Sequence, residues 1–301
     1  MSTVLKVTDL EVDFHANGLL TNSPLRGLGF EIESGKTLGI VGETGCGKTL
    51  TATAIMGLLP STAVQRGAIE FTHQGVQTTS DLASLRGSEI TMIFQNPASA
   101  FNPVFTIGAQ LTLVAQRRNI ARAKISELLV ARLQSVGLKD SKRVLDSYPH
   151  QLSGGMLQRC MIAMALISSP TLLIADEPTT ALDATIGNQV LSLISTLQEQ
   201  EGFAMLFISH DVSAVAKVSD DIAVVYSGRI VETGPTDDVI NSPQHRIREA
   251  CSAQSLLPRR HVDPLLQFQG MCHLLLSQLR VVHLPHGVHF ESIVVVRSHL
   301  F

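Results

Sequence analysis

The sequence predicts an α/β fold in which a mostly parallel sheet is covered by helices on both faces. Several short apolar runs, often β-branched, do not alternate with polar residues, which is typical of strands buried on both faces. These runs are TLGIVG (37–42), ITMIF (90–94), TLLIA (171–175), AMLFIS (204–209) and IAVVY (222–226). The first run is followed by a glycine-rich loop and by the helical segment 48–59, so strand, loop and helix come in direct succession.

A helical subdomain is predicted between about residues 97 and 160, inside this α/β core. The segments IGAQLTLVAQRR and AKISELLVARLQSVGL both read as helices, and Gly137 ends the second of them. After the last apolar run, YSGRIVETG (226–234) predicts a hairpin that turns at Ser227–Gly228.

Length and composition indicate one large domain, or a core domain with an extension, because the chain has 301 residues and is 45% hydrophobic. The net charge of −3 gives no electrostatic footprint for nucleic acid. The N-terminus reads as a strand and not as a signal peptide, and no apolar stretch is long enough to span a membrane. The four cysteines form no CxxC pair, so we expect free thiols and a cytoplasmic location.

The glycine-rich loop GETGCGKT (42–49) matches the phosphate-binding motif G-x-x-x-x-G-K-[ST] in full. Glycines let backbone amides close around phosphate oxygens, the lysine reaches the β- and γ-phosphates, and the final hydroxyl coordinates Mg²⁺. We interpret Cys46 as a small residue that fills space in this loop. The predicted nucleotide-binding residues are Gly42, Glu43, Thr44, Gly45, Cys46, Gly47, Lys48 and Thr49.

Two adjacent carboxylates follow the apolar run TLLIA, at the end of a strand where α/β sheets bind ligands. Asp176 is placed to hold Mg²⁺, and Glu177 is placed to polarise the attacking water. The sequence thus predicts hydrolysis of a nucleoside triphosphate.

A second candidate phosphate loop lies in YPHQLSGGMLQR (148–159), where Ser153, Gly154 and Gly155 precede a predicted helix. Free N–H groups and the helix dipole favour phosphate at such an N-terminus. One domain does not need two phosphate loops for one nucleotide.

These motifs resemble those of the ATP-binding subunits of ABC transporters, and the resemblance covers about residues 4–250. It implies a P-loop core of the RecA-like kind, an N-terminal antiparallel β subdomain and the inserted helical subdomain. LSGGM (152–156) resembles the signature of that family, in which two ATPase domains face each other head to tail. The second loop would then contact the γ-phosphate of ATP bound to the partner subunit.

Three further residues match motifs of this family, in the family's order. The resemblance implies that Gln95 senses the nucleotide and helps to bind Mg²⁺, and that Asp183 crosses to the opposite site. It also implies that His210 orders the γ-phosphate and the attacking water, so that Glu177 and His210 are the catalytic pair. Phe14 is the aromatic residue near the place where the family stacks a ring on adenine, although it reads equally well as a core residue of the first strand.

The segments QNPASAFNPVFTIG and YPHQLSGGMLQRCMIAMAL resemble the oligopeptide, dipeptide and nickel importers in particular. The MLQR and SAFNP forms lean towards nickel or metal chelates, and peptide cargo is the alternative. The resemblance implies two membrane-spanning permease subunits, a second ATPase subunit of the same or a paralogous kind, and indirectly an extracytoplasmic binding protein. The chain would then lie peripherally on the cytoplasmic face of the membrane.

Two other functions remain as alternatives. A soluble ABC ATPase of translation or DNA repair usually has two cassettes or a long coiled coil, and neither is found here. A non-hydrolysing partner would have lost Glu177, His210 or the signature, and all three are intact.

Residues 256–301 are expected to form an irregular tail outside the ATP-binding domain, which we place at 1–255. His283, His286 and His289 suggest a metal site, but Pro285 and Gly287 interrupt any helix that would align them. We prefer the hypothesis that a frame-shifted reading of the gene produces the sequence after about residue 258.

Overall fold

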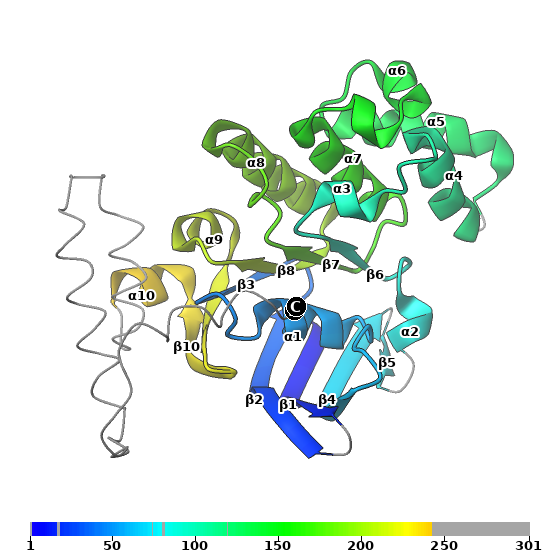
Figure 1. Ribbon diagram of the computed structural model, residues 1–301. Coiled ribbons are helices and arrows are strands. Elements are labelled where there is room, and N and C mark those ends of the chain that lie inside the picture. Colours follow the sequence, from blue (N-terminus) through cyan, green and yellow to red (C-terminus); the bar gives the residue numbers. More distant parts are fainter. Residues whose placement is uncertain (1, 17–18, 74, 80–81, 119, 243–301) are drawn as a thin grey trace, which may run out of the picture. The chain divides into compact units, whose positions relative to one another are not determined.

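The computed structural model describes residues 2–16, 19–73, 75–79, 82–118 and 120–242, all within a compact unit that spans Met1–Leu256. Two sheets organise this unit (Figure 1). The predicted tail, residues 256–301, lies outside the described residues. Its histidines and the segment for which we hypothesise a frame shift lie there too.

The larger sheet has six strands in the order β10-β9-β3-β8-β7-β6. Its strands are β3 (Thr37–Gly42), β6 (Ile90–Ile93), β7 (Leu172–Asp176), β8 (Ala204–Ser209), β9 (Asp221–Tyr226) and β10 (Arg229–Pro235). All neighbours pair in parallel except β10, which turns back on β9 through the predicted hairpin. Every residue of β3, β7 and β8 is buried, which explains why their sequences do not alternate. The α/β fold class is therefore confirmed.

The smaller sheet is antiparallel and has the order β2-β1-β4-β5. Its strands are β1 (Thr3–Ala16), β2 (Leu19–Glu33), β4 (Ala63–His73) and β5 (Val76–Thr78). Its buried side chains share one core cluster with helix α1 (Lys48–Ile55) and with one face of the larger sheet. Helix α1 stops four residues before the predicted end at Leu59, and Gly57 follows it with a φ of 61°.

The helices between β6 and β7 form the insert, and they pack on a second core cluster together with the other face of the sheet (Figure 1). They are α3 (Pro97–Ala100), α4 (Ile107–Arg117), α5 (Arg122–Ser135), α6 (Ser141–Asp146), η1 (Pro149–Gln151) and α7 (Gly154–Leu166). Gly137, with a φ of 82°, follows α5 as predicted. The remaining helices are α2 (Leu82–Leu85), α8 (Ala184–Glu201), α9 (Val212–Val218) and α10 (Thr236–Asn241).

Candidate nucleotide-binding site

The glycine-rich loop joins the buried strand β3 to the N-terminus of α1, and two of its glycines have no room for a side chain. A Cβ atom on Gly42 would lie 2.2 Å from the Val225 carbonyl oxygen. A Cβ atom on Gly47, which caps α1 with a φ of 106°, would lie 2.4 Å from Leu25 Cδ2. The loop thus holds its backbone close to its neighbours and presents the unpaired N–H groups of a first helical turn.

Lys48 is buried beneath this loop, with 5% of its surface exposed. Its ammonium donates hydrogen bonds to the carbonyl oxygens of Gly42 and Glu43, both at 2.8 Å. Cys46 is buried beside it, and burial raises the pKa of the Cys46 thiol. A neutral, buried thiol agrees with the interpretation of Cys46 as a space-filling residue.

Asp176 ends strand β7 and is 2% exposed, and its Oδ1 accepts a hydrogen bond from the Thr49 hydroxyl at 3.2 Å. Burial raises the pKa of Asp176 to about 6, and the charge of neighbouring Glu177 adds to this effect. A buried carboxylate beside a hydroxyl is the oxygen-donor chemistry that Mg²⁺ prefers, with its remaining ligands coming from phosphates and water. Among the described residues, no group of three or more His, Cys, Asp and Glu side chains is arranged to hold a metal ion. The Asp176 carboxylate and the Thr49 hydroxyl form the candidate magnesium site, and the third predicted ligand, Gln95, donates its amide N–H to Glu177.

Glu177 follows directly, and its backbone adopts a left-handed φ of 47°, while its N–H donates to the Ile208 carbonyl at 2.8 Å. Its Oε2 accepts hydrogen bonds from Thr180 Oγ1 at 2.8 Å and from Gln95 Nε2 at 3.0 Å. Its Oε1 lies 3.1 Å from His210 Nδ1.

The groups around Glu177 determine whether its carboxyl group is ionised. Burial alone would raise the pKa of Glu177, but the hydrogen bonds from Thr180 and His210, together with the charges of His210 and Lys48, hold this pKa below its usual value. The carboxylate is therefore ionised at neutral pH, as a general base requires.

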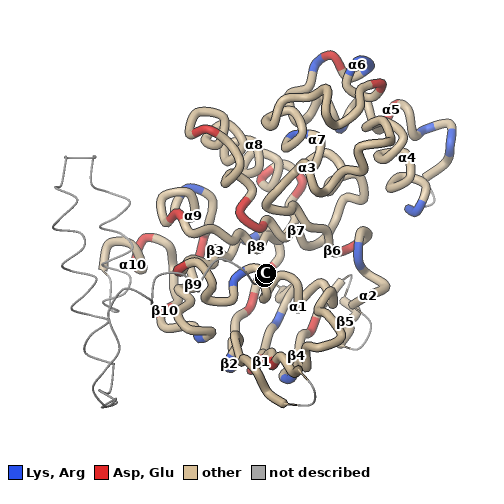
Figure 2. The backbone as a smooth tube through the Cα atoms, viewed as in Figure 1, with Lys and Arg blue, Asp and Glu red and all other residues tan. Residues whose placement is uncertain are grey.

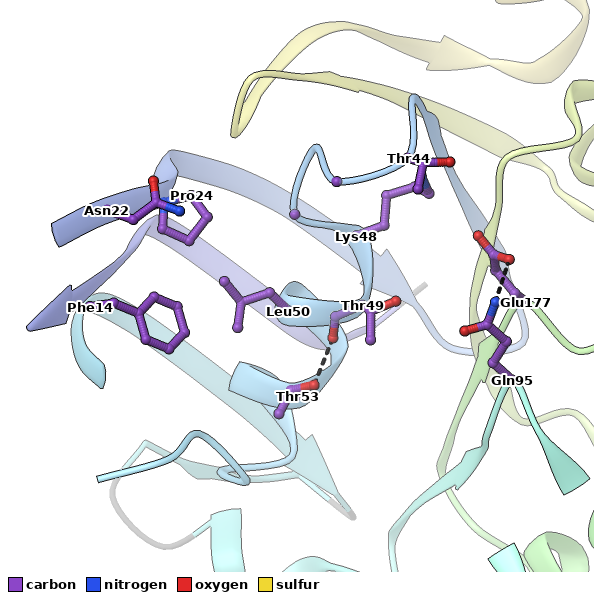
Figure 3. A pocket seen from close by; sticks show the side chains of 12 residues that line it. Phe14, Asn22, Pro24, Thr44, Lys48, Thr49, Leu50, Thr53, Gln95 and Glu177 are labelled. Atoms are coloured by element: carbon purple, nitrogen blue, oxygen red, sulfur yellow. Dashed lines mark hydrogen bonds between the residues drawn. The ribbon is translucent and has the colours of Figure 1, made fainter. Parts of the chain in front are cut away.

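A cavity of about 480 Å³ is lined by Lys48, Thr49, Gln95 and Glu177 but not by Asp176 or His210, and its two ends differ in chemistry (Figure 3). Lys48, Thr49, Gln95 and Glu177 form a polar end, whereas Phe14, Pro24 and Leu50 form a largely apolar end. The full lining is Phe14, Asn22, Pro24, Thr44, Gly45, Gly47, Lys48, Thr49, Leu50, Thr53, Gln95 and Glu177. This arrangement suits a ligand with an aromatic base at one end and phosphates at the other.

The comparisons with known proteins agree with this geometry. A family model described as ABC transporter matches residues 25–180. The dipeptide transport ATP-binding protein DppD of Bacillus subtilis is 44% identical over 251 residues, covering 81% of this chain and 74% of the relative. The chain belongs to the ABC transporter family. It is an ATPase of that family, and it binds ATP.

Other relatives and solved structures extend this finding. The oligopeptide transport ATP-binding protein OppD of Bacillus subtilis is 41% identical over 250 residues, covering 81% of this chain and 70% of the relative. A solved ATP-binding subunit of an ABC transporter aligns with a TM-score of 0.64 and 25% identity, over 84% of this chain and all of that chain. A dimeric ATP-binding cassette in a post-hydrolysis state, bound to ADP and Pi, aligns with a TM-score of 0.65 and 23% identity. The alignment covers 77% of this chain and 98% of that chain, and it supports the assignment of the fold.

The ABC signature segment does not line this cavity. Ser153 caps helix α7, since its Oγ accepts a hydrogen bond from the Met156 N–H at 3.3 Å. Gly154 and Gly155 form the first turn of that helix, and a Cβ atom on Gly155 would lie 2.9 Å from Ile186 Cγ2. Of the described residues that line the cavity, none comes from 153–155, so the structure does not bring the two phosphate loops of one chain together.

Asp183 has a structural task inside its own chain. Its carboxylate caps helix α8 and accepts hydrogen bonds from the N–H groups of Thr185 and Ile186, at 3.1 and 2.9 Å. This cap fixes the loop between Glu177 and α8. The role of Asp183 across a subunit interface stays a prediction.

Sequence reasoning missed several residues of the site. Thr180 holds Glu177 in place, and its position three residues after Glu177 in DEPTT was an available signal. Asn22 and Pro24 line the cavity from strand β2, which the sequence did not reveal as a strand. Phe14 both lines the cavity and packs against the core, so the two interpretations of this residue are compatible.

Proposed function

We propose that this chain is the ATP-hydrolysing subunit of an importer of small peptides. The polar end of the cavity supports the hydrolytic part of this proposal, because an ionised Glu177 lies in reach of Gln95, Thr180 and His210. The cargo rests on the relatives named for dipeptide and oligopeptide transport, at 44% and 41% identity.

The surroundings of the residues support the following roles. Lys48 and the amides at the start of α1 would bind the phosphates, and Thr49, Asp176 and Gln95 would hold Mg²⁺. Mg²⁺, when bound, neutralises charge on the β- and γ-phosphates. Glu177 accepts a proton from the attacking water, and His210 orients the carboxylate that does so. Such a reaction depends on positioning and charge more than on covalent chemistry.

A second ATPase subunit completes each site, in our proposal, with Ser153, Gly154 and Gly155 of its signature and with Asp183. The location of Ser153 at a helix N-terminus away from its own cavity supports this arrangement. ATP binding then closes the pair of subunits, and hydrolysis reopens it.

Exposed apolar side chains, one of them next to Gln95 in the chain and the others in the helical insert, support docking to the membrane-spanning permease subunits. Phe94, Val104, Phe105, Leu113 and Tyr148 are 40%, 69%, 51%, 59% and 39% exposed. The Ile107 N–H donates to the Ser147 carbonyl at the start of α4, which brings together the segments that carry Phe105 and Tyr148. No described helix is long and apolar enough to cross a membrane. We therefore propose peripheral attachment at the cytoplasmic face through these permeases, which also link the chain to an extracytoplasmic binding protein.

Nucleic acid is not among the proposed partners. Basic and acidic positions are interspersed along the described backbone (Figure 2), and the net charge is −3. A basic stripe of the kind that tracks phosphates would require a different distribution.

Nickel is the second candidate cargo, favoured by the MLQR and SAFNP segments. Uptake of a radiolabelled dipeptide and of radiolabelled nickel, in cells carrying the wild-type chain or Glu177→Gln, separates the two cargoes. We expect Glu177→Gln to abolish dipeptide uptake and to leave nickel uptake unchanged. Loss of nickel uptake alone would assign the chain to metal import and contradict the peptide proposal.

A further inference from the structure

The apolar end of the nucleotide cavity, formed by Phe14, Pro24 and Leu50, also contains the polar side chain of Asn22. Asn22 pairs with Phe14 across the antiparallel strands β1 and β2, so the two side chains lie side by side on one face of the sheet. Figure 3 shows both at the end of the cavity opposite Gln95 and Glu177. An amide is therefore next to the ring on which a base would stack.

The hydroxyl donors of Thr21 and Ser23, beside Asn22 in the chain, and of Thr53 are already engaged. Thr21 Oγ1 donates to the Phe14 carbonyl at 2.9 Å, and Ser23 Oγ donates to Asp13 Oδ1 at 2.5 Å. Thr53, which also lines the cavity, donates to the Thr49 carbonyl at 2.7 Å. Within the described part of the chain, no hydrogen bond is found for the exposed side-chain amide of Asn22.

We propose that Asn22 reads the edge of the purine base and gives this ATPase a preference for adenine over guanine. The proposal rests on the proposed function, in which a base stacks on Phe14. A carboxamide presents an amino donor beside a carbonyl acceptor, and these match N7 and the N6 amino group of adenine. Guanine offers two acceptors, O6 and N7, at the same edge, so only one of the two hydrogen bonds can form.

Stacking by itself cannot supply this preference, because every base has a π-face and aromatic stacking tolerates all of them. Pro24 and Leu50, the other side chains at this end, offer no hydrogen bond to a base edge. Discrimination at this end of the cavity is therefore assigned to Asn22.

The test is displacement of the fluorescent analogue MANT-ATP from the full chain by ATP and by GTP, with Mg²⁺ present. For each variant, the affinity for ATP is divided by the affinity for GTP measured on the same protein sample. Errors in protein concentration or in the folded fraction therefore cancel from this ratio. Because a bidentate Asn–adenine pair is involved, we expect wild type to prefer ATP by about tenfold. We expect Asn22→Ala to reduce that ratio to about twofold or less, and Asn22→Arg to shift it towards GTP, because arginine pairs with O6 and N7 of guanine.

Leu20→Arg is the matched control for added charge, because Leu20 lies on the same strand, is 59% exposed and does not line the cavity. Extra positive charge there should strengthen binding of ATP and GTP alike and leave their ratio unchanged. An unchanged ratio in both Asn22 variants, with MANT-ATP still bound, would overturn the role of Asn22. Absence of MANT-ATP binding in wild type would instead overturn the proposed function itself.

Discussion

Asp176 and Glu177 are neighbours in the chain, yet their surroundings separate their chemistry. Asp176 is enclosed by strands and has the Thr49 hydroxyl as its hydrogen-bond donor, so its pKa rises to about 6. Glu177 leaves the strand through a left-handed turn and gathers donors from three segments, so its pKa falls. Two adjacent carboxylates with opposite shifts suit two different roles, one as a metal ligand and one as a base.

Replacing Glu177 with glutamine should remove the base and retain the shape. Glutamine can still accept a hydrogen bond from Thr180, so the loop should hold its position. We expect the ATPase rate to fall by about 10²–10⁴-fold, with ATP affinity changed by less than about threefold. Steady-state phosphate release and nucleotide titration measure the two quantities. Glu199→Gln, an exposed change on α8, is the matched control, and equal rates in both variants would exclude Glu177 as the base.

Asp176 should make the free protein less stable as pH rises. Below about pH 4 its carboxyl group is protonated in both the folded and the unfolded chain, so its ionisation does not lower the free energy of unfolding in that pH range. Above pH 6 the folded chain must ionise a buried group, because its folded pKa of about 6 exceeds the unfolded value. In the absence of Mg²⁺ and nucleotide, we expect Asp176→Asn to raise the free energy of unfolding by on the order of 2 kcal/mol at pH 7.5, and by little at pH 4.

Urea unfolding at several pH values measures this difference. Asp146→Asn, an exposed change at the end of α6, should show no such pH dependence. An Asp176→Asn variant that is no more stable than wild type at pH 7.5 would contradict a buried, costly carboxylate at this position.

At the scale of elements, the sequence predicted those segments whose signals are local. The buried parallel strands were found because burial on both faces leaves an unbroken apolar run, and the phosphate loop was found because its glycines are spaced by the turn itself. Strands β2 and β4 were missed, since their solvent face carries polar and charged residues and their partners lie far along the chain. The end of α1 was misplaced because the apolar residues after Gly57 continue the pattern beyond the helix.

Ser153, at the start of helix α7, caps the helix and is proposed to contact ATP in the partner subunit, and substitutions can separate these two roles. Ser153 caps the helix, so Ser153→Ala should lower the free energy of unfolding by about 1 kcal/mol. Ser153→Asp keeps a good cap and should keep wild-type stability. We nevertheless expect Ser153→Asp to lose ATPase activity, because a carboxylate would face the γ-phosphate of ATP in the partner subunit. Urea unfolding and phosphate release measure the two effects, and an active Ser153→Asp variant would restrict Ser153 to helix capping.

At the scale of the whole molecule, the phosphate loop and the signature segment of one chain lie apart, and we propose that each is half of a composite site. The phosphate loop and Glu177 line one cavity, with Asp176 bonded to Thr49 beside it, whereas the signature caps helix α7. The sequence could predict both motifs because each is local. It could not predict the identity of the partner subunit or the cargo, because motifs for nucleotide binding carry no information about either.

We propose that a second ATPase subunit completes the site, and for two copies of this chain the most direct test is to mix two inactive variants. Lys48→Ala damages the phosphate loop and leaves the signature intact, and Ser153→Asp does the reverse. Random pairing of equal amounts gives half mixed dimers, each with one intact composite site, so we expect the mixture to regain about a quarter of the wild-type ATPase rate. A mixture no more active than its two components, beside an active wild-type chain, would show that each chain uses its own signature and would contradict the account.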